Sequence, residues 1–282
     1  MSIRLRIHGS PTLPTLIYLP GMHGDWTLVQ SFRHAIAGQV RFVEMEYPRT
    51  TNWLPEDYAR EIEAALIAEG VGEGWVIGES FGSQVAWAMT GRSSRDGRSR
   101  REEAHSVSGQ LETPHVVTYH HGAFRPLGLI LAGGFVKHPW PRGAKFLRGI
   151  SGWIPSWAMR ALLGVYSTYA HFRHRHAPET LASVGEFVAN RFAPGDKAAL
   201  QHRYTLIAEF DPRPVAAKTQ LPVYHLAGLI DPLVPNALVH CWLKRNCPGF
   251  RESRTILSAD HNVLGSSPQK SLEQILKWIR SA

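Results

Sequence analysis

The chain has very little cysteine and no long unbroken apolar run. Its 282 residues include only two cysteines, Cys241 and Cys247. Two thiols cannot form a disulfide framework, and no metal-ligand pattern surrounds them, so we interpret both as structural thiols. No stretch reaches the roughly 18 consecutive apolar residues that a membrane-spanning helix needs. These absences exclude a disulfide-stapled domain and a membrane span.

Acidic residues are fewer than basic ones, and the formal net charge is +8. Such a surplus is compatible with nucleic acid, a membrane surface or anionic substrates as partners. The arginines are scattered and no nucleic-acid motif is present, so we favour a solvated basic surface and expect no nucleic-acid partner. The first residues alternate apolar and basic side chains, as a strand does, instead of forming the apolar core of a signal peptide. We therefore expect a soluble, cytoplasmic protein.

What the chain does have is an alternation of strand and helix patterns. Short apolar runs predict strands over 16–19, 40–45, 74–78, 127–132, 221–226 and 253–257. Helical spacing of apolar residues predicts helices over 28–37, 55–68, 84–89, 237–244 and 268–279. Strands that alternate with helices predict an α/β fold with a mostly parallel central sheet flanked by helices. In such sheets ligands bind at the carboxyl ends of the strands, so the loops that follow strands should carry the chemistry.

Two segments interrupt this alternation. Residues 91–122 are rich in Ser, Arg, Gly and His and far exceed the roughly 2–6 residues usual for such a connection. We interpret them as a flexible surface insertion, with an RNA-binding or docking arm as the alternative. Residues 135–210 carry amphipathic helical patterns without strands, which predicts a helical cap over the site. The expected domains are a core of 1–134 with 211–282 and a cap of 135–210.

The predicted cap is rich in aromatic and basic residues. We expect its aromatic side chains to form the apolar underside of the cap rather than a cofactor site. They are Trp140, Phe146, Trp153, Trp157 and Tyr166. The His- and Arg-rich run over 170–176 is interpreted as basic cap surface, because the neighbouring arginines disfavour a bound cation. No metal and no cofactor is expected.

The sequence GESFG, from Gly78 to Gly82, holds a serine between two glycines. Ser80 follows the apolar run Trp75-Val76-Ile77 and precedes a predicted helix. A serine in a sharp turn between strand and helix, with flanking glycines that avoid crowding, is typical of a nucleophile elbow. A serine hydroxyl is a weak nucleophile, so it needs a base and a group that orients the base.

Later loops provide both partners. Asp231 lies in a loop bounded by Gly and Pro after the predicted strand over 221–226. An Asp in such a loop often caps a helix or makes an Asx turn, which is the structural alternative to a catalytic acid. His261 lies in the last strand-to-helix loop. The chain order Ser, Asp, His is the order expected of this arrangement, and it predicts that these three residues are catalytic.

The oxyanion of an acyl intermediate needs two hydrogen-bond donors. One should be the Phe81 N–H, at the start of the helix that follows Ser80. The other should come from the loop after the strand over 16–19. If Pro20-Gly21 forms the donor turn, the donor is the Met22 N–H, which we prefer. If His23-Gly24 forms it, the donor is Asp25.

In the motifs LPGMHG, GESFG, GLIDPLVP and SADHNVL, the chain resembles the α/β-hydrolase superfamily, and more closely its carboxylesterase-like serine hydrolases with a helical cap. The resemblance extends over nearly the whole chain apart from 91–122. Two departures from the family pattern stand out. Pro20 replaces a common histidine, and Asp260 replaces the glycine that usually precedes the catalytic histidine, which could alter how His261 is presented.

The resemblance implies a serine hydrolase that cleaves a carboxylic ester or related acyl compound through an acyl-enzyme. The expected partner is a small-molecule acyl substrate, whose identity the motifs leave open, as they do the oligomeric state. A thioesterase, an acyltransferase or a C–C bond hydrolase would use the same triad and are the alternatives. A non-catalytic binding protein of the same fold is a further class, disfavoured because all three triad members are present. A dehalogenase or epoxide hydrolase is disfavoured because those relatives carry a carboxylate at the elbow.

Overall fold

The computed structural model describes residues 2–92, 123–173, 175, 178–191 and 193–282. Residues 91 and 92 continue the helix that begins at 82, and the rest of the insertion predicted over 91–122 lies outside the described residues. Among the described residues, no helix is long and apolar enough to cross a membrane. Neither cysteine is in a disulfide, and Cys247 is buried whereas Cys241 is exposed.

Seven strands form one twisted sheet in the described part of the chain, in the order β1-β3-β2-β4-β5-β6-β7. The strands are β1 (Arg4–His8), β2 (Thr15–Leu19), β3 (Arg41–Glu46), β4 (Glu73–Glu79), β5 (Arg125–Ala132), β6 (Val223–Ile230) and β7 (Phe250–Asp260). Only β1 is antiparallel to its neighbour, and the remaining pairs are parallel. The prediction of a mostly parallel α/β sheet is therefore confirmed.

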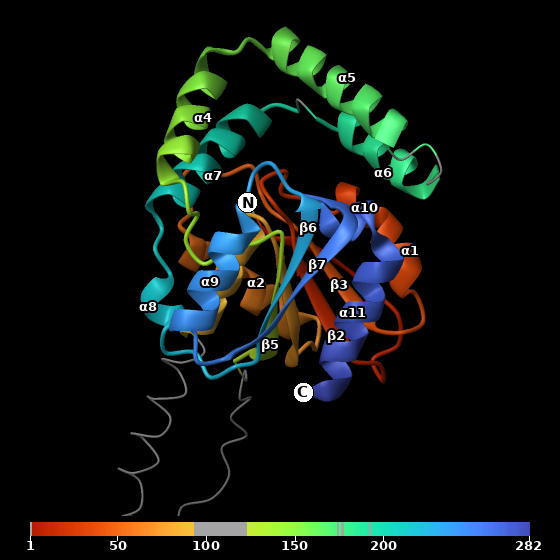
Figure 1. Ribbon diagram of the computed structural model, residues 1–282, viewed down its shortest axis with the longest axis vertical. Helices are drawn as coiled ribbons and strands as arrows, with labels where there is room; N and C mark the ends of the chain where they lie inside the picture. The colour runs from red at the N-terminus through yellow and green to blue at the C-terminus, as the bar shows by residue number, and fades with distance from the viewer. Residues whose placement is uncertain (1, 93–122, 174, 176–177, 192) are drawn as a thin grey trace, which may run out of the picture.

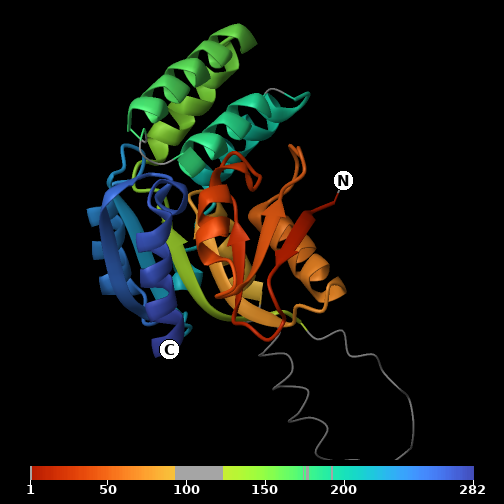
Figure 2. The same cartoon turned by 90° about the vertical axis from the view of Figure 1, so that its right-hand side faces the viewer.

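Helices cover both faces of the sheet (Figures 1 and 2). One face is covered by α2 (Pro55–Ala68), the helix over 82–92 and α9 (Asn236–Asn246), near the short helix α8 (Arg213–Ala216). The other is covered by the 3-10 helix η1 (Thr27–Val29) with α1 (Gln30–Ile36), α10 (Val263–Ser266) and α11 (Pro268–Ser281).

The strand sequences explain these two layers. In β2, Leu16 and Tyr18 belong to the core of one face, whereas Ile17 and Leu19 belong to the core of the other. Successive side chains of a strand point to opposite faces. A strand covered on both faces must therefore be apolar throughout, which is why these strands read as short continuous apolar runs.

Between β5 and α8 the described chain forms four helices: α4 (Pro141–Trp153), α5 (Ser156–Arg173), α6 (Pro178–Ala189) and α7 (Asp196–Glu209). We call them the α4–α7 segment. Here α4 packs on α7 and α5 packs on α6. The segment lies over the carboxyl ends of the strands, with α4 and α5 outermost (Figures 1 and 2).

The expectation that five aromatic residues of the predicted cap, 135–210, form its underside was wrong for four of them. Their side chains are 65–91% exposed: Trp140, Phe146, Trp153 and Trp157. Only Tyr166 turns inward, where its ring meets Phe187 of α6. The inner face of α5 is built instead from Tyr166 and the buried Ala170, because a small residue lets the two helices approach closely.

Candidate active site

Ser80 occupies the turn between β4 and the following helix, in a strained backbone conformation. Its φ is 49°, and among the described residues it is the one non-glycine residue with positive φ. This conformation costs an L-residue roughly 1–2 kcal/mol and persists only where the surrounding structure enforces it. The turn is fixed by a hydrogen bond from Ser80 N to Ala132 O (3.1 Å) and one from Ser83 Oγ to Ser80 O (2.6 Å).

The two flanking glycines are required by close backbone approach. A Cβ atom on Gly82 would lie 2.1 Å from the carbonyl oxygen of Leu19, at the end of the neighbouring strand. A Cβ on Gly78 would lie 2.7 Å from the Cα of Ser83. The motif thus has a steric explanation: only glycine allows β2, the turn and the helix to pack at this distance.

Sheet register brings Asp231 and His261 together. Ile230 of β6 and Asp260 of β7 are a Cα pair in the parallel ladder, so the residues that follow them leave the sheet side by side. The His261 Nδ1 and Asp231 Oδ2 atoms are 2.9 Å apart. The other carboxylate oxygen, Oδ1, accepts the N–H groups of Leu233 and Val234, both at 2.9 Å. Asp231 therefore makes the Asx turn and also engages the imidazole.

The two groups shift each other's pKa in the complementary directions expected of an ion pair. Burial alone would lower the pKa of His261, but the hydrogen bond and charge of Asp231 outweigh it and raise that pKa above 6.5. Burial alone would raise the pKa of Asp231, but the bond to His261 and the two backbone N–H donors lower it. The carboxylate thus stays ionised and fixes Nδ1, which leaves Nε2 to exchange a proton.

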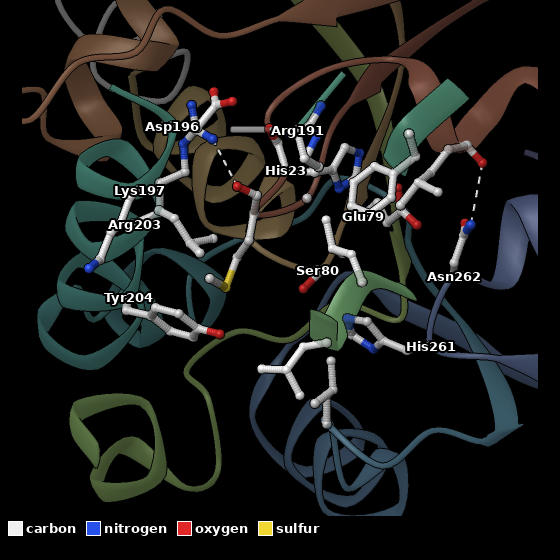
Figure 3. A pocket seen from close by; sticks show the side chains of 18 of the residues that line it. His23, Glu79, Ser80, Arg191, Asp196, Lys197, Arg203, Tyr204, His261 and Asn262 are labelled. Carbon is white, nitrogen blue, oxygen red and sulfur yellow. Dashed lines mark hydrogen bonds between the residues drawn. The ribbon is translucent and has the colours of Figure 1, made fainter. Parts of the chain in front are cut away.

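Ser80 and His261 both line a pocket of about 480 Å³ at the carboxyl ends of the strands. Figure 3 shows the two side chains next to each other on its wall. Most of the remaining lining is apolar and comes from the α4–α7 segment and from the loops after β2 and β6. Its apolar residues are Met22, Leu28, Ile154, Leu162, Leu163, Phe187, Leu200 and Leu233. The pocket therefore presents a hydroxyl and an imidazole to an apolar guest.

Solved structures resemble the whole chain, although no protein-family model and no curated protein matches it. A thermophilic esterase from Thermogutta terrifontis matches with a TM-score of 0.69 and 18% identity, covering 99% of this chain and 93% of that one. The enol-lactonase from Burkholderia xenovorans matches with a TM-score of 0.71 and 14% identity, covering 99% and 96%. An alpha/beta hydrolase from a deep-sea metagenome library of the Medee basin matches with a TM-score of 0.69 and 12% identity, covering 98% of this chain and 94% of that one.

The fold is that of the α/β-hydrolases. At these identities the similarity shows the fold alone, and the chemistry has to be argued from the site. In this fold the loop after β2 faces the elbow, and here a Cβ on Gly21 would lie 3.4 Å from the Cβ of Ser80. Met22, the preferred second oxyanion donor, lines the pocket, whereas Asp25, the alternative, does not. Within the described residues, the N–H groups of Met22 and Phe81 donate to no protein acceptor.

Two arginines connect this loop to the α4–α7 segment of the hydrolase fold. Arg203 of α7 is 4% exposed and donates from Nη1 to Met22 O (2.8 Å) and from Nη2 to Pro48 O (3.3 Å). Arg191 donates from Nη1 to His23 O (2.9 Å) and pairs with the Asp25 carboxylate. The loop that carries Met22 is therefore fixed by hydrogen bonds from two arginines of the 190–209 region. Sequence reasoning missed both residues, because arginines bound to backbone carbonyls 155 to 181 positions away leave no motif.

A buried carboxylate under the elbow was also missed. Glu79, which immediately precedes Ser80, is 3% exposed and accepts the Tyr18 hydroxyl. Burial raises the pKa of Glu79 to about 7, and the bond from Tyr18 opposes that effect only in part. The Gly-x-Ser-x-Gly motif specifies no residue type at this position, so nothing in the motif indicates that the Glu79 side chain turns into the protein.

The departure at Asp260 has a local structural role. Its Oδ1 accepts the Asn262 N–H at 3.0 Å, and its own N–H donates to Ser266 Oγ at 3.2 Å. These bonds stabilise the turn that carries His261. Asp260 at this position is therefore compatible with the hydrogen bond between His261 and Asp231. Among the described residues, no group of three or more His, Cys, Asp or Glu side chains is arranged to hold a metal ion.

Proposed function

We propose that the protein is a serine hydrolase that cleaves a carboxylic ester or related acyl compound, with Ser80, His261 and Asp231 as its catalytic triad. One observation carries the proposal. A serine held at a φ of 49° shares an apolar pocket with an imidazole whose Nδ1 is bonded to a buried carboxylate. The strained backbone of Ser80 presents its hydroxyl to the pocket. A turn with only a structural role would not need this strain, whereas a nucleophile elbow does.

In the proposed mechanism, Ser80 Oγ attacks the acyl carbon and its proton passes to His261 Nε2. Asp231 holds Nδ1 and stabilises the imidazolium that forms. The N–H groups of Met22 and Phe81 receive the oxyanion. The imidazolium then protonates the leaving group. Water, deprotonated by the same nitrogen, hydrolyses the acyl-enzyme and restores Ser80.

The lining of the pocket favours an apolar acyl group. Most of its lining surface is apolar, and its volume of about 480 Å³ is within the range of small-molecule sites. The enol-lactonase and the N-acyl homoserine lactonase from other organisms share the fold, so cyclic esters belong in the substrate screen. Thioester hydrolysis, acyl transfer and C–C bond hydrolysis remain alternatives with the same triad, and a non-catalytic binding protein is the less favoured class. We also propose that residues 135–210 act as a cap, and that the protein works in the cytoplasm.

The test combines a labelling probe with a series of p-nitrophenyl esters of increasing acyl length. We expect a fluorophosphonate to label Ser80, and we expect Ser80→Ala and His261→Ala to remove ester turnover while the protein stays folded. His34→Ala, on the exposed surface of α1, is the matched histidine control and should be fully active. Unchanged turnover in Ser80→Ala would refute the assignment. Folded wild-type protein that neither labels nor hydrolyses any ester would favour a binding protein.

A further inference from the structure

The outer face of α4 and α5 is an extended apolar surface with no partner among the described residues. On α5, every large residue of one stripe is 48–73% exposed: Leu162, Val165, Tyr169 and Phe172. Their spacing of three, four and three residues places them on one side of the helix. The adjoining side carries Tyr166, which contacts Phe187 of α6, and the buried Ala170. The helix is therefore apolar on two adjoining sides, and the side with Tyr166 is the one that packs on α6.

The junction between the two helices extends this surface. Phe146 and Trp153 lie seven residues apart on α4, and Trp157 follows in the first turn of α5. Their side chains are 65%, 91% and 73% exposed. Together with Gly149 and Pro155 they border a shallow groove. Exposed apolar surface of this extent on a soluble domain marks an interaction site rather than ordinary surface.

The charge around this face indicates what it meets. Residues 138–178 contain no Asp or Glu, and their six basic residues are Arg142, Lys145, Arg148, Arg160, Arg173 and Arg175. This region thus carries +6 of the chain's formal net charge of +8. A second copy of the chain would bring an equally positive face, and like charges oppose that pairing. Exposed Trp and Phe beside Lys and Arg are the composition of helices that bind the interface of an anionic lipid bilayer.

We propose that α4 and α5 dock on an anionic lipid surface, with Trp153 and Trp157 inserted at the headgroup level. In Figures 1 and 2 these helices are the outermost layer above the carboxyl ends of the strands, so docking would leave the sheet facing away from the lipid. Leu162 belongs both to the exposed stripe and to the pocket that contains Ser80. An acyl compound dissolved in the bilayer would thus meet the pocket at the docked face. The proposal concerns binding and does not depend on the proposed triad.

The test is co-sedimentation of the full chain with lipid vesicles. The Ser80→Ala protein is used, so that hydrolysis cannot change the lipid. We expect binding to vesicles of phosphatidylcholine mixed with phosphatidylglycerol, weakening as salt is raised, and much weaker binding to phosphatidylcholine alone. The double substitution Trp153→Ser/Trp157→Ser should weaken binding about tenfold or more, since it removes two interfacial indoles. Arg142→Glu/Lys145→Glu should weaken it by roughly thirtyfold or more at low ionic strength.

Matched controls lie on α11, at the other end of the molecule. Lys277→Glu/Arg280→Glu makes the same change in net charge at two exposed positions and should leave binding within a factor of about two. Equal loss in this control would show non-specific attraction and overturn the proposal, as would unchanged binding in the Trp153→Ser/Trp157→Ser protein. A wild-type dimer in solution that the tryptophan substitutions convert to monomer would also overturn it, because a second copy would then cover the face. If ester turnover failed but vesicle binding followed this pattern, the docking proposal would stand alone.

Discussion

The pocket has a floor and a roof that are built in different ways. The floor consists of strand ends whose positions follow from sheet register and from glycines that permit no side chain. The roof consists of the α4–α7 segment, most of whose aromatic residues are exposed. Its contacts with the rest of the protein include two arginines that bind the loop after β2. The comparison teaches that the positions of Ser80, Asp231 and His261 depend on the backbone geometry of the strand ends, whereas the loop that carries Met22 also depends on side chains of the α4–α7 segment.

The largest effect should come from changing the floor alone. Asp231→Asn preserves the size of the side chain but removes the charge that fixes His261, so kcat/KM should fall by roughly 10⁴-fold. The wild-type pKa of His261 is raised above 6.5, and a general base works only when neutral. The acid limb of the kcat/KM profile should therefore have its midpoint above pH 6.5, and in Asp231→Asn it should move to lower pH. A wild-type midpoint well below that value would contradict the role given to Asp231.

The contact between floor and roof should have the next largest effect. Arg203→Met removes the donors to the carbonyls of Met22 and Pro48 and should cost about 1–3 kcal/mol of unfolding free energy, since buried acceptors are left unpaired. If Arg203 also positions the Met22 peptide for the oxyanion, kcat should fall roughly a hundredfold in the folded protein with little change in KM.

Arg203→Lys should restore part of that kcat, and the exposed Arg213→Met on α8 serves as the control. A stability loss with normal kcat would limit Arg203 to a structural role, and the two halves of the pocket would then be functionally separate.

These two comparisons also show what the sequence could provide. The strand and helix order was predictable, and so was the position of Ser80, Asp231 and His261 in turns and loops that follow strands. Each signal lies within a few residues: a glycine-flanked serine, a loop after an apolar run, a chain order. No separate helix was predicted at the position of α4 or of α7. The contacts of Arg191, Arg203 and Glu79 were not predicted either. Their roles depend on contacts with residues 61 to 181 positions away, and nothing local distinguishes a buried arginine from one on the surface.

The pH dependence of stability should distinguish the buried carboxylate of Glu79 from carboxylates on the surface. The pKa of Glu79 rises from 4.5 to about 7 on folding, so the folded state holds its proton more tightly than the unfolded state. Its contribution is fully present below pH 4.5 and is lost as the pH rises through about 7, a change of roughly 3 kcal/mol. Glu79→Gln should flatten the dependence of unfolding free energy on pH across this range, measured by urea titration. Glu69→Gln, at an exposed position, is the control and should leave the pH dependence of the unfolding free energy unchanged. An unchanged pH dependence in Glu79→Gln would show that Glu79 is not the buried titrating group.

The smallest expected effect concerns the strain at the elbow. Glycine adopts a φ of 49° freely, whereas alanine does not. Ser80→Gly should therefore be more stable than Ser80→Ala by about 1 kcal/mol, although both lack the hydroxyl. Equal urea midpoints for the two variants would show that the turn stores no strain.

The arginine contacts limit how this protein could be re-engineered. Exchanging the α4–α7 segment for that of another protein is an obvious route to a new substrate preference. Here such a graft would also delete the groups that bind the Met22 and His23 carbonyls. It would remove the neighbour of Gly24 as well, since a Cβ added at Gly24 would lie 2.3 Å from Arg203 Nη1. A chimaera that kept Arg191 and Arg203, or placed equivalent donors there, would preserve the loop. One designed on pocket shape alone would also alter the loop that carries Met22, although only the α4–α7 segment was meant to change.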